Sequence, residues 1–229
     1  GMMLGVDGVH DAFDRMHFGR PTGIDQTSEA AGLIPSVAYY NRRYGPTGWT
    51  KGFIPSIAIG QGEVLFTPIQ LCAYAAALGD GKYWRQPYLV EGVYDPETRT
   101  LKRRPIPEPD PIDASPENIA LVREGMRRVV WGSGTAAGQR DEQCPIAGKT
   151  GTAQNPHGDD HAWFVGFAPV DHPIIATCVL VEFGEHGSSM AAPLSKEIMK
   201  HFVLSEQAGD SSRAAKVETV AVVQAGADD

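Results

Sequence analysis

The stretch Gly148-Lys149-Thr150-Gly151-Thr152-Ala153-Gln154 decides the fold, and a short approach, Pro145-Ile146-Ala147, precedes it. Small and β-branched residues in this order predict a strand. Lys149 offers a cation to a substrate carboxylate or a neighbouring hydroxyl, Thr150 adds a hydroxyl donor, and Gly151 lets a substrate backbone approach closely. The alternative is a glycine-containing edge strand whose exposed lysine has no further role.

The last third of the chain, around this stretch, is predicted to form strands. Residues 145–154, 162–168 and 174–183 are apolar or β-branched runs separated by polar turns, which is typical of an antiparallel meander. In the tail beyond Ser205, only residues 217–223 have the composition of a strand. A helix is expected between the last strand and the tail, with Pro193 near its first turn and a buried stripe of Leu194, Ile198, Met199 and Phe202.

The beginning of the chain predicts a helix and then a long loop. Val6, Val9, Phe13 and Met16 follow the spacing of a helix that opens the sequence. Residues 19–59 are rich in Gly, Pro and Tyr, so we expect an irregular region of the kind that walls a binding cleft.

Two more helices and a hairpin are expected before the strands. Thr67 as N-cap and the alanines that follow predict a helix that ends before Gly79. Residues 83–107 alternate apolar and polar side chains around a turn at residues 95–97, which predicts a peripheral hairpin. Strands packed by helices from both ends of the chain indicate an α+β fold. The helix after Ser115 is expected to bury Ile119, Val122, Met126, Val129 and Val130.

The composition excludes several classes of function. The 229 residues carry 28 acidic and 20 basic side chains, a net charge of −8, so nucleic acid is not an expected partner. No window approaches the ~20 apolar residues of a membrane-spanning helix, and no leader opens the printed sequence, so we expect a soluble chain. Cys72, Cys144 and Cys178 lack the spacing of a disulfide framework or a zinc site, although two could pair in an oxidising compartment.

Two other groups of polar residues are weaker candidates for a site. His157, Asp159, Asp160 and His161 are side chains that metals use, but Gly158 and Asp159 also form turns well, so neither a metal nor a cofactor is predicted. Three serines have no base at a helical or hairpin spacing and are not predicted as nucleophiles: Ser133, Ser188 and Ser189.

The Lys149 stretch and several others resemble a known family. Residues 148–154, followed by His161-Ala162-Trp163-Phe164-Val165-Gly166-Phe167-Ala168-Pro169, resemble the transpeptidase domain of class B penicillin-binding proteins, particularly the elongation type. The resemblance covers residues 1–204 and leaves 205–229 as a tail. Further landmarks occur in the family's order: Gly19-Arg20-Pro21-Thr22-Gly23-Ile24-Asp25, Ala58-Ile59-Gly60-Gln61-Gly62, Thr67-Pro68-Ile69-Gln70-Leu71 and Val122-Arg123-Glu124-Gly125-Met126.

The resemblance implies a penicillin-binding/β-lactamase-like transpeptidase fold of the α+β class, with an antiparallel sheet packed by helices. It also implies three active-site elements, Ser-x-x-Lys, Ser-x-Asn and Lys-Thr-Gly. In this chain no Lys has a Ser three residues before it, and no Asn has a Ser two residues before it. In the family both elements precede the opening helix, so we expect a C-terminal portion of the domain, with the N-terminal part missing.

The same resemblance assigns roles to residues of the strand. Lys149 binds the substrate carboxylate and assists proton transfer, Thr150 and Thr152 donate hydroxyls to that carboxylate, and Gly151 completes the motif. The backbone N–H of Thr152 forms half of an oxyanion hole, and the nucleophile forms the other half. Two residues are expected to shape the substrate cleft, although their alternative role is packing within the sheet: Gln154 and Trp163.

The reaction that the resemblance implies is peptidoglycan cross-linking outside the inner membrane. A serine attacks a D-Ala-D-Ala stem peptide, D-Ala leaves, and the acyl group passes to another peptide's amine; β-lactams mimic the donor. Without its nucleophile the chain is expected to be inactive alone, and its uncovered core to favour self-association or the missing upstream half. The alternatives are a D-Ala-D-Ala carboxypeptidase or β-lactamase-like hydrolase, and a non-catalytic penicillin-receptor-like remnant.

Overall fold

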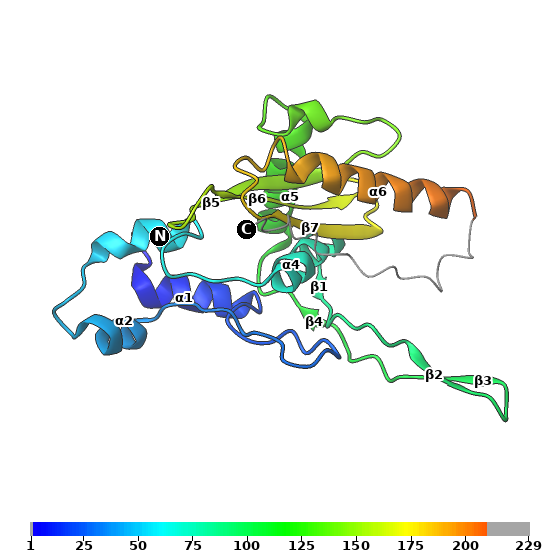
Figure 1. Ribbon diagram of the computed structural model, residues 1–229, viewed down its shortest axis with the longest axis horizontal. Coiled ribbons are helices and arrows are strands. Elements are labelled where there is room, and N and C mark those ends of the chain that lie inside the picture. The colour runs from blue at the N-terminus through cyan, green and yellow to red at the C-terminus, as the bar shows by residue number, and fades with distance from the viewer. Residues whose placement is uncertain (1, 210–229) are drawn as a thin grey trace, which may run out of the picture. The chain divides into compact units, whose positions relative to one another are not determined.

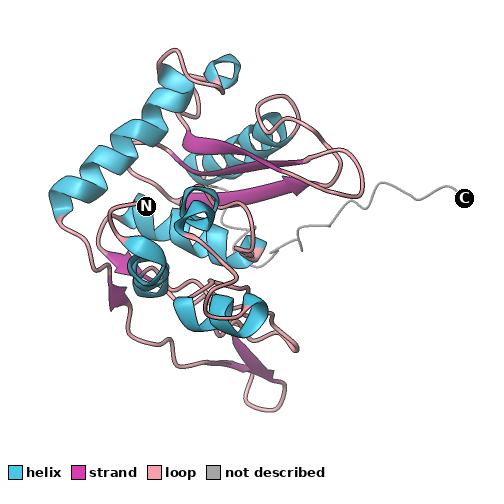
Figure 2. Cartoon of the chain, turned by 90° about the vertical axis from the view of Figure 1, so that its left-hand side faces the viewer, coloured by secondary structure: helices cyan, strands magenta, loops and turns pink. Residues whose placement is uncertain are grey.

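The structure is a computed structural model that describes residues 2–209, and the chain divides into two compact units (Figure 1). Unit 1 comprises Gly1–Ala77 and Lys82–Ala114, and unit 2 comprises Leu78–Gly81 and Ser115–Asp229. Both units contain helices and antiparallel strands (Figure 2), which is the α+β class that the sequence predicts. In the described part of the chain no helix is long and apolar enough to cross a membrane, and no disulfide joins any of the cysteines.

Unit 2 is built on a three-stranded antiparallel sheet. Its strands are β5 (Ala147–Ala153), β6 (His161–Ala168) and β7 (Ile175–Val181), with β6 in the centre. The register places Lys149 of β5 opposite Val165 of β6. The predicted meander is therefore confirmed. No other strand within residues 2–209 joins this sheet, so β5 and β7 form its outer edges.

Two helices pack on this sheet, α5 (Pro116–Trp131) and α6 (Ala191–Gln207) (Figure 1). Phe164 and Phe167 of β6 are three residues apart, so they point to opposite faces of the sheet. Phe164 belongs to a core cluster with side chains of α6, and the guanidinium of Arg123 in α5 lies 5.4 Å from the centre of the Phe167 ring. Elements of the same unit therefore cover both faces of the sheet.

The buried stripe of α6 differs from the predicted one. Leu194, Ile198 and Phe202 are 51%, 41% and 38% exposed, so the prediction is wrong for these three residues. The small residues at the start of α6 let the helix approach the sheet closely, and Met199 and Val203 pack further along the same side. The predicted strand at residues 217–223 lies outside the described residues. The buried residues of α6 are Ala191, Ala192, Ser195, Met199 and Val203.

Helix α5 begins where the sequence predicts. The Ser115 hydroxyl accepts the Asn118 N–H at 3.3 Å, which caps the first turn. Val122 is 44% exposed, so the prediction that it is buried is wrong. The buried stripe is narrower than expected because it consists of Ile119, Met126 and Val130.

Unit 1 contains more helix than the sequence analysis predicts. Helix α1 (Gly5–Arg15) confirms the opening helix. Residues 19–59 were expected to be irregular, yet they hold α2 (Val37–Tyr44), a 3-10 turn (Lys51–Phe53) and α3 (Ile54–Ala58). These short helices form because they bury apolar side chains together, in a cluster of Val6, Val9, Tyr40, Ile54, Ile57 and Val64.

Helix α4 (Pro68–Asp80) runs two residues further than the predicted end. Gly79 does not stop the helix, because Gly81 is the residue with positive φ, at +81°. Gly79 instead permits close packing, since an added Cβ would lie 3.2 Å from Pro173 and 3.3 Å from Phe167.

The predicted hairpin is present in unit 1 and is shorter than expected. Its strands are β2 (Gly92–Asp95) and β3 (Thr100–Arg103), joined by a turn at the predicted place. A separate short pair consists of β1 (Tyr83–Trp84) and β4 (Asp110–Pro111).

Candidate active site on strand β5

The predicted site residues lie along β5, an outer strand of the sheet. The register pairs Lys149 with Val165 and Gly151 with Trp163, so these four side-chain positions share one face. Thr150 and Thr152 occupy the opposite face, because side chains alternate along a strand. The structure thus brings Lys149, Gly151 and Trp163 together.

Lys149 is exposed, and its ammonium donates a hydrogen bond to the carbonyl oxygen of Thr150. The cation therefore lies beside the backbone of its own strand, where an arriving carboxylate can replace one of its contacts with solvent. A cation held at an outer strand can bind an anion while the strand binds an extended chain.

The two threonines of the motif have different surroundings. Thr150 is only 9% exposed, and its hydroxyl lies 2.7 Å from the Thr135 hydroxyl. Thr152 is exposed near the end of the strand. The Thr150 hydroxyl, which is predicted to reach a substrate, therefore makes a hydrogen bond within unit 2. Thr135 was missed by the sequence analysis because nothing in its local pattern distinguishes it from a loop residue.

A close approach of three backbone segments surrounds Gly151. An added Cβ at Gly151 would lie 3.1 Å from the Cβ of Trp163. An added Cβ at Gly187 would lie 2.3 Å from the carbonyl oxygen of Trp163 and 2.5 Å from that of Gly151. The Ala192 N–H donates to the Gly187 carbonyl at 2.8 Å, so Gly187 also holds the start of α6. Trp163 is partly buried here, whereas Gln154 is exposed just beyond β5.

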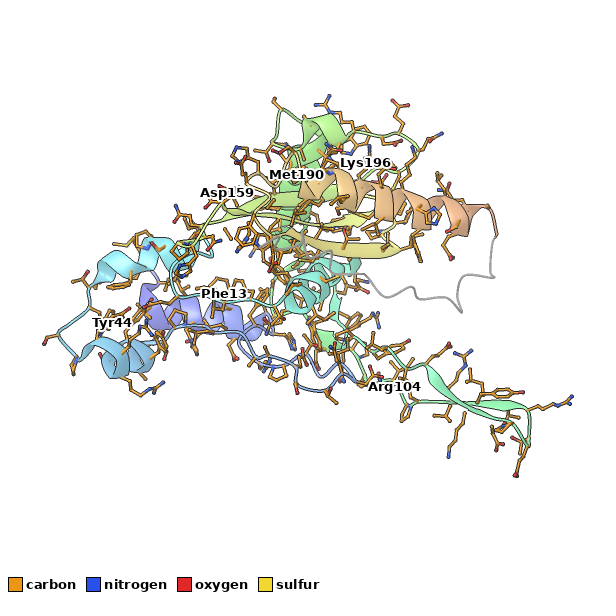
Figure 3. The ribbon with its side chains drawn as sticks, in the orientation of Figure 1. Phe13, Tyr44, Arg104, Asp159, Met190 and Lys196 are labelled. Carbon is orange, nitrogen blue, oxygen red and sulfur yellow. The ribbon has the colours of Figure 1, made fainter. Side chains whose placement is uncertain are left out.

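The polar residues between β5 and β6 form a turn (Asp159 is labelled in Figure 3). The Asn155 N–H donates to the Asp160 carboxylate at 3.2 Å, and the His157 N–H donates to the Asn155 side chain at 3.0 Å. His161 accepts the Phe183 N–H at its Nδ1, at 3.0 Å. Within residues 2–209, no three His, Cys, Asp or Glu side chains are arranged to hold a metal ion.

Two serines in the described part of unit 2 make contacts that do not activate a hydroxyl. The Ser189 hydroxyl donates to the carbonyl oxygen of His186 at 3.3 Å, and the buried Ser195 hydroxyl lies 2.6 Å from that of Thr177. A nucleophilic serine needs a base within hydrogen-bond reach, and neither contact provides one.

In unit 1, Gln70 joins two of the stretches that carry the family resemblance. Thr67 and Gln70 cap α4 reciprocally, with the Thr67 N–H donating to Oε1 at 2.9 Å and the Gln70 N–H donating to the Thr67 hydroxyl at 3.2 Å. The Gln70 Nε2 donates to the carbonyl oxygens of Arg20 at 2.8 Å and Ala31 at 2.9 Å. The predicted N-cap is confirmed, and these stretches hold unit 1 together.

Comparisons with known proteins agree with this architecture. The family model "Penicillin binding protein transpeptidase domain" matches residues 2–200. The chain is 32% identical over 219 residues to the peptidoglycan D,D-transpeptidase MrdA of Acinetobacter baumannii. The alignment covers 89% of this chain and 32% of that protein. The chain thus spans about a third of the curated relatives' length.

Solved structures give the same result. Pseudomonas aeruginosa PBP2 in complex with WCK 5153 has a TM-score of 0.76 and 38% identity, over 88% of this chain and 44% of that one. Helicobacter pylori PBP2, in a complex with MreC, has a TM-score of 0.75 and 28% identity, over 90% of this chain and 37% of that one. The resemblance noted in the sequence is thereby confirmed: the chain belongs to the penicillin binding protein transpeptidase domain family.

Proposed function

We propose that the chain is the carboxylate-binding part of a peptidoglycan D,D-transpeptidase domain and that it forms no acyl-enzyme by itself. The observation that carries this proposal is the place of Lys149, which is exposed on the outer strand β5. A stem peptide ending in D-Ala-D-Ala can lie along this strand, with its terminal carboxylate against the Lys149 ammonium.

The proposed reaction in the intact parent has two acyl-transfer steps. A serine oxygen attacks the carbonyl between the two D-alanines, the amide bond breaks, and the terminal D-Ala leaves with a proton on its amine. An amine of a second stem peptide then attacks the resulting ester, an amide forms, and the serine regains its proton. Lys149 orients the donor, and Gly151 allows β5 to pack closely against Trp163 and Gly187, which fixes the strand that carries Lys149.

The serine of this mechanism is proposed to come from a segment outside the printed sequence. The chain has no Ser-x-x-Lys or Ser-x-Asn. Leu194, Ile198 and Phe202 form an exposed apolar stripe on α6 of the kind that a further segment covers. In the intact parent, stem peptides and β-lactams are then the ligands, and the reaction takes place outside the cytoplasm, where peptidoglycan lies.

Labelling with a fluorescent penicillin tests the proposal. The chain is incubated with the drug, denatured, and examined by gel and intact mass. We expect no covalent adduct, because acylation requires an activated hydroxyl. Co-expression with the parent's upstream segment is expected to restore labelling, Lys149→Ala to remove it, and Lys51→Ala, at an exposed lysine in unit 1, to leave it unchanged. A stoichiometric adduct on the chain alone would overturn the proposal.

A further inference from the structure

The β2–β3 hairpin of unit 1 is a small, ordered element with no third strand among residues 2–209 (Figure 1). Its tip is fixed by Asp95, whose Oδ1 accepts the N–H groups of Glu97 at 2.9 Å and Thr98 at 3.2 Å. These bonds hold the pKa of the Asp95 carboxyl below its ordinary value. The hairpin thus presents its side chains from a defined turn.

Both faces of the hairpin expose large apolar side chains (Figure 3). Tyr94 lies opposite Leu101 on one face, and Val93 lies opposite Lys102 on the other. The exposed fractions are 58% for Tyr94, 44% for Leu101 and 69% for Val93. An isolated two-stranded hairpin is only marginally stable in water, because it has little apolar surface to bury. Exposed apolar side chains gathered on such an element indicate a binding role.

One side of the hairpin is basic in a chain whose net charge is −8, whereas Glu91, Asp95 and Glu97 lie along the other strand and in the turn, so residues 91–104 carry a net charge of +1. Residues 99–104 include four basic side chains and no acidic one. Arg103 pairs with Glu91, and Arg104 pairs with Asp25 at 3.1 Å. In the part of the chain that the structure describes, the side chains of Arg99 and Lys102 have neither an ion pair nor a hydrogen bond.

The base of the hairpin is anchored to unit 1 through Asp25. Its carboxylate accepts the N–H groups of Leu89 at 2.6 Å and Val90 at 2.9 Å, as well as the Arg104 guanidinium, which is labelled in Figure 3. Arg104 in turn lies 5.2 Å from the centre of the Tyr88 ring. A ligand held by the hairpin is therefore held by a fixed part of unit 1.

We propose that the Gly92–Arg103 hairpin is a second binding surface for the peptidoglycan strand, distinct from β5. Arg99 and Lys102 bind carboxylates of the stem peptides, and Tyr94 packs against the apolar faces of sugar rings and N-acetyl methyl groups. The identity of the polymer rests on the proposed function. A polymer substrate extends beyond its reacting bond, so a second contact raises its effective concentration at the first.

The size and charge of the surface favour this ligand over a protein. A stable protein interface takes about 20–30 residues on each side, which is more than two strands of four residues provide. A polymer with a carboxylate and a ring in each repeat can use a small basic and aromatic surface many times.

Pelleting with purified, protein-free peptidoglycan sacculi tests the proposal. Arg99→Glu with Lys102→Glu is expected to weaken binding on the order of tenfold, because the change removes two cations from the surface and the introduced carboxylates repel those of the ligand. Arg42→Glu with Lys51→Glu, at exposed basic residues elsewhere in unit 1, makes the same change in net charge and is the control. Equal effects of the two double variants, or no binding by the wild type, would overturn the proposal.

Further variants separate the chemistry and the alternatives. Tyr94→Ala is expected to weaken binding and Tyr94→Phe to retain it, because the ring provides the contact. Phosphatidylglycerol vesicles are tested in parallel, and binding to vesicles without binding to sacculi would refute the proposal in favour of a membrane surface. Lys149→Ala is expected to retain sacculus binding while removing penicillin labelling in the complemented domain. If the wild type does not bind sacculi but the complemented domain is still labelled, the hairpin proposal alone fails; if the wild type binds sacculi but complementation restores no labelling, the proposed function alone fails.

Discussion

Replacing Gly187 by alanine is expected to destabilise unit 2 around the candidate site. The new Cβ would lie 2.3 Å from the carbonyl oxygen of Trp163 and 2.5 Å from that of Gly151. Both are backbone atoms of paired strands, so they cannot rotate away as the end of a side chain can. Overpacking of this kind costs about 1–3 kcal/mol, and for a chain of this size each kcal/mol lowers the Tm by about 2–4 °C.

Thermal melting followed by circular dichroism measures the effect. We expect the Tm of Gly187→Ala to fall by about 2–12 °C. Gly125→Ala is the matched control, because Gly125 lies inside α5 and an added Cβ there has no atom within 4 Å. It is expected to raise the Tm slightly, since alanine is favoured over glycine in a helix by about 0.5–1 kcal/mol. A Gly187→Ala chain that melts with or above the wild type would refute the packing argument.

Three more predictions concern unit 2. Thr150→Val is expected to cost about 1 kcal/mol by leaving the Thr135 hydroxyl without its 2.7 Å partner, and a double-mutant cycle with Thr135→Val measures the coupling. The Lys200 ammonium holds the pKa of the Asp141 carboxyl below its ordinary value. This pair therefore contributes stability above about pH 4 that is lost as the pH falls through the lowered pKa, so Asp141→Asn should melt with a weaker acid dependence than the wild type. Finally, light scattering is expected to show association of the chain through the exposed apolar stripe of α6, which consists of Leu194, Ile198 and Phe202. Replacing these residues by polar ones should reduce the association. A monodisperse monomer would contradict a role for the stripe.

The strands of unit 2 could be predicted because their signals are local. Each strand is a β-branched or apolar run bounded by turn residues, and the order of the runs indicates a meander. The buried stripe of α6 could not be predicted in this way. The helix is apolar on two sides, and the side with small residues, such as Ala191 and Ala192, packs on the sheet, while Leu194 and Ile198 remain exposed. Both sides carry large apolar residues, since Met199 and Val203 are on the buried side, so hydrophobicity alone does not choose between them.

The short helices of unit 1 had local signals that the composition obscured. Ser36 caps α2, since its hydroxyl accepts the Tyr39 N–H at 3.1 Å, and Gly45 follows the helix with φ of +82°. The high content of Gly, Pro and Tyr nevertheless favoured a loop. An N-cap and a terminating glycine with eight residues between them are therefore stronger evidence than average composition.

The candidate site was predictable only as far as its contiguous motif. Lys149 and Gly151 could be identified because the three adjacent residues Lys-Thr-Gly are enough to recognise the motif. The contacts that hold their strand come from Thr135 and Gly187, which are distant in sequence and belong to segments without a recognisable pattern. The contacts of such residues arise from tertiary packing, so they are seen only in the folded structure.

The composition and edge position of β7 also affect how the chain behaves before it has folded. Its seven residues, Ile175–Val181, contain neither a charge nor a proline or glycine, and they form an outer edge of the sheet within the described residues. Segments of this composition add readily to identical segments of other chains. Pro173 and Glu182 flank the run as the residues that oppose such stacking. The yield of folded protein during synthesis is therefore set by competition between docking of β7 on β6 and growth of intermolecular β-structure, and it falls as the concentration of nascent chains rises.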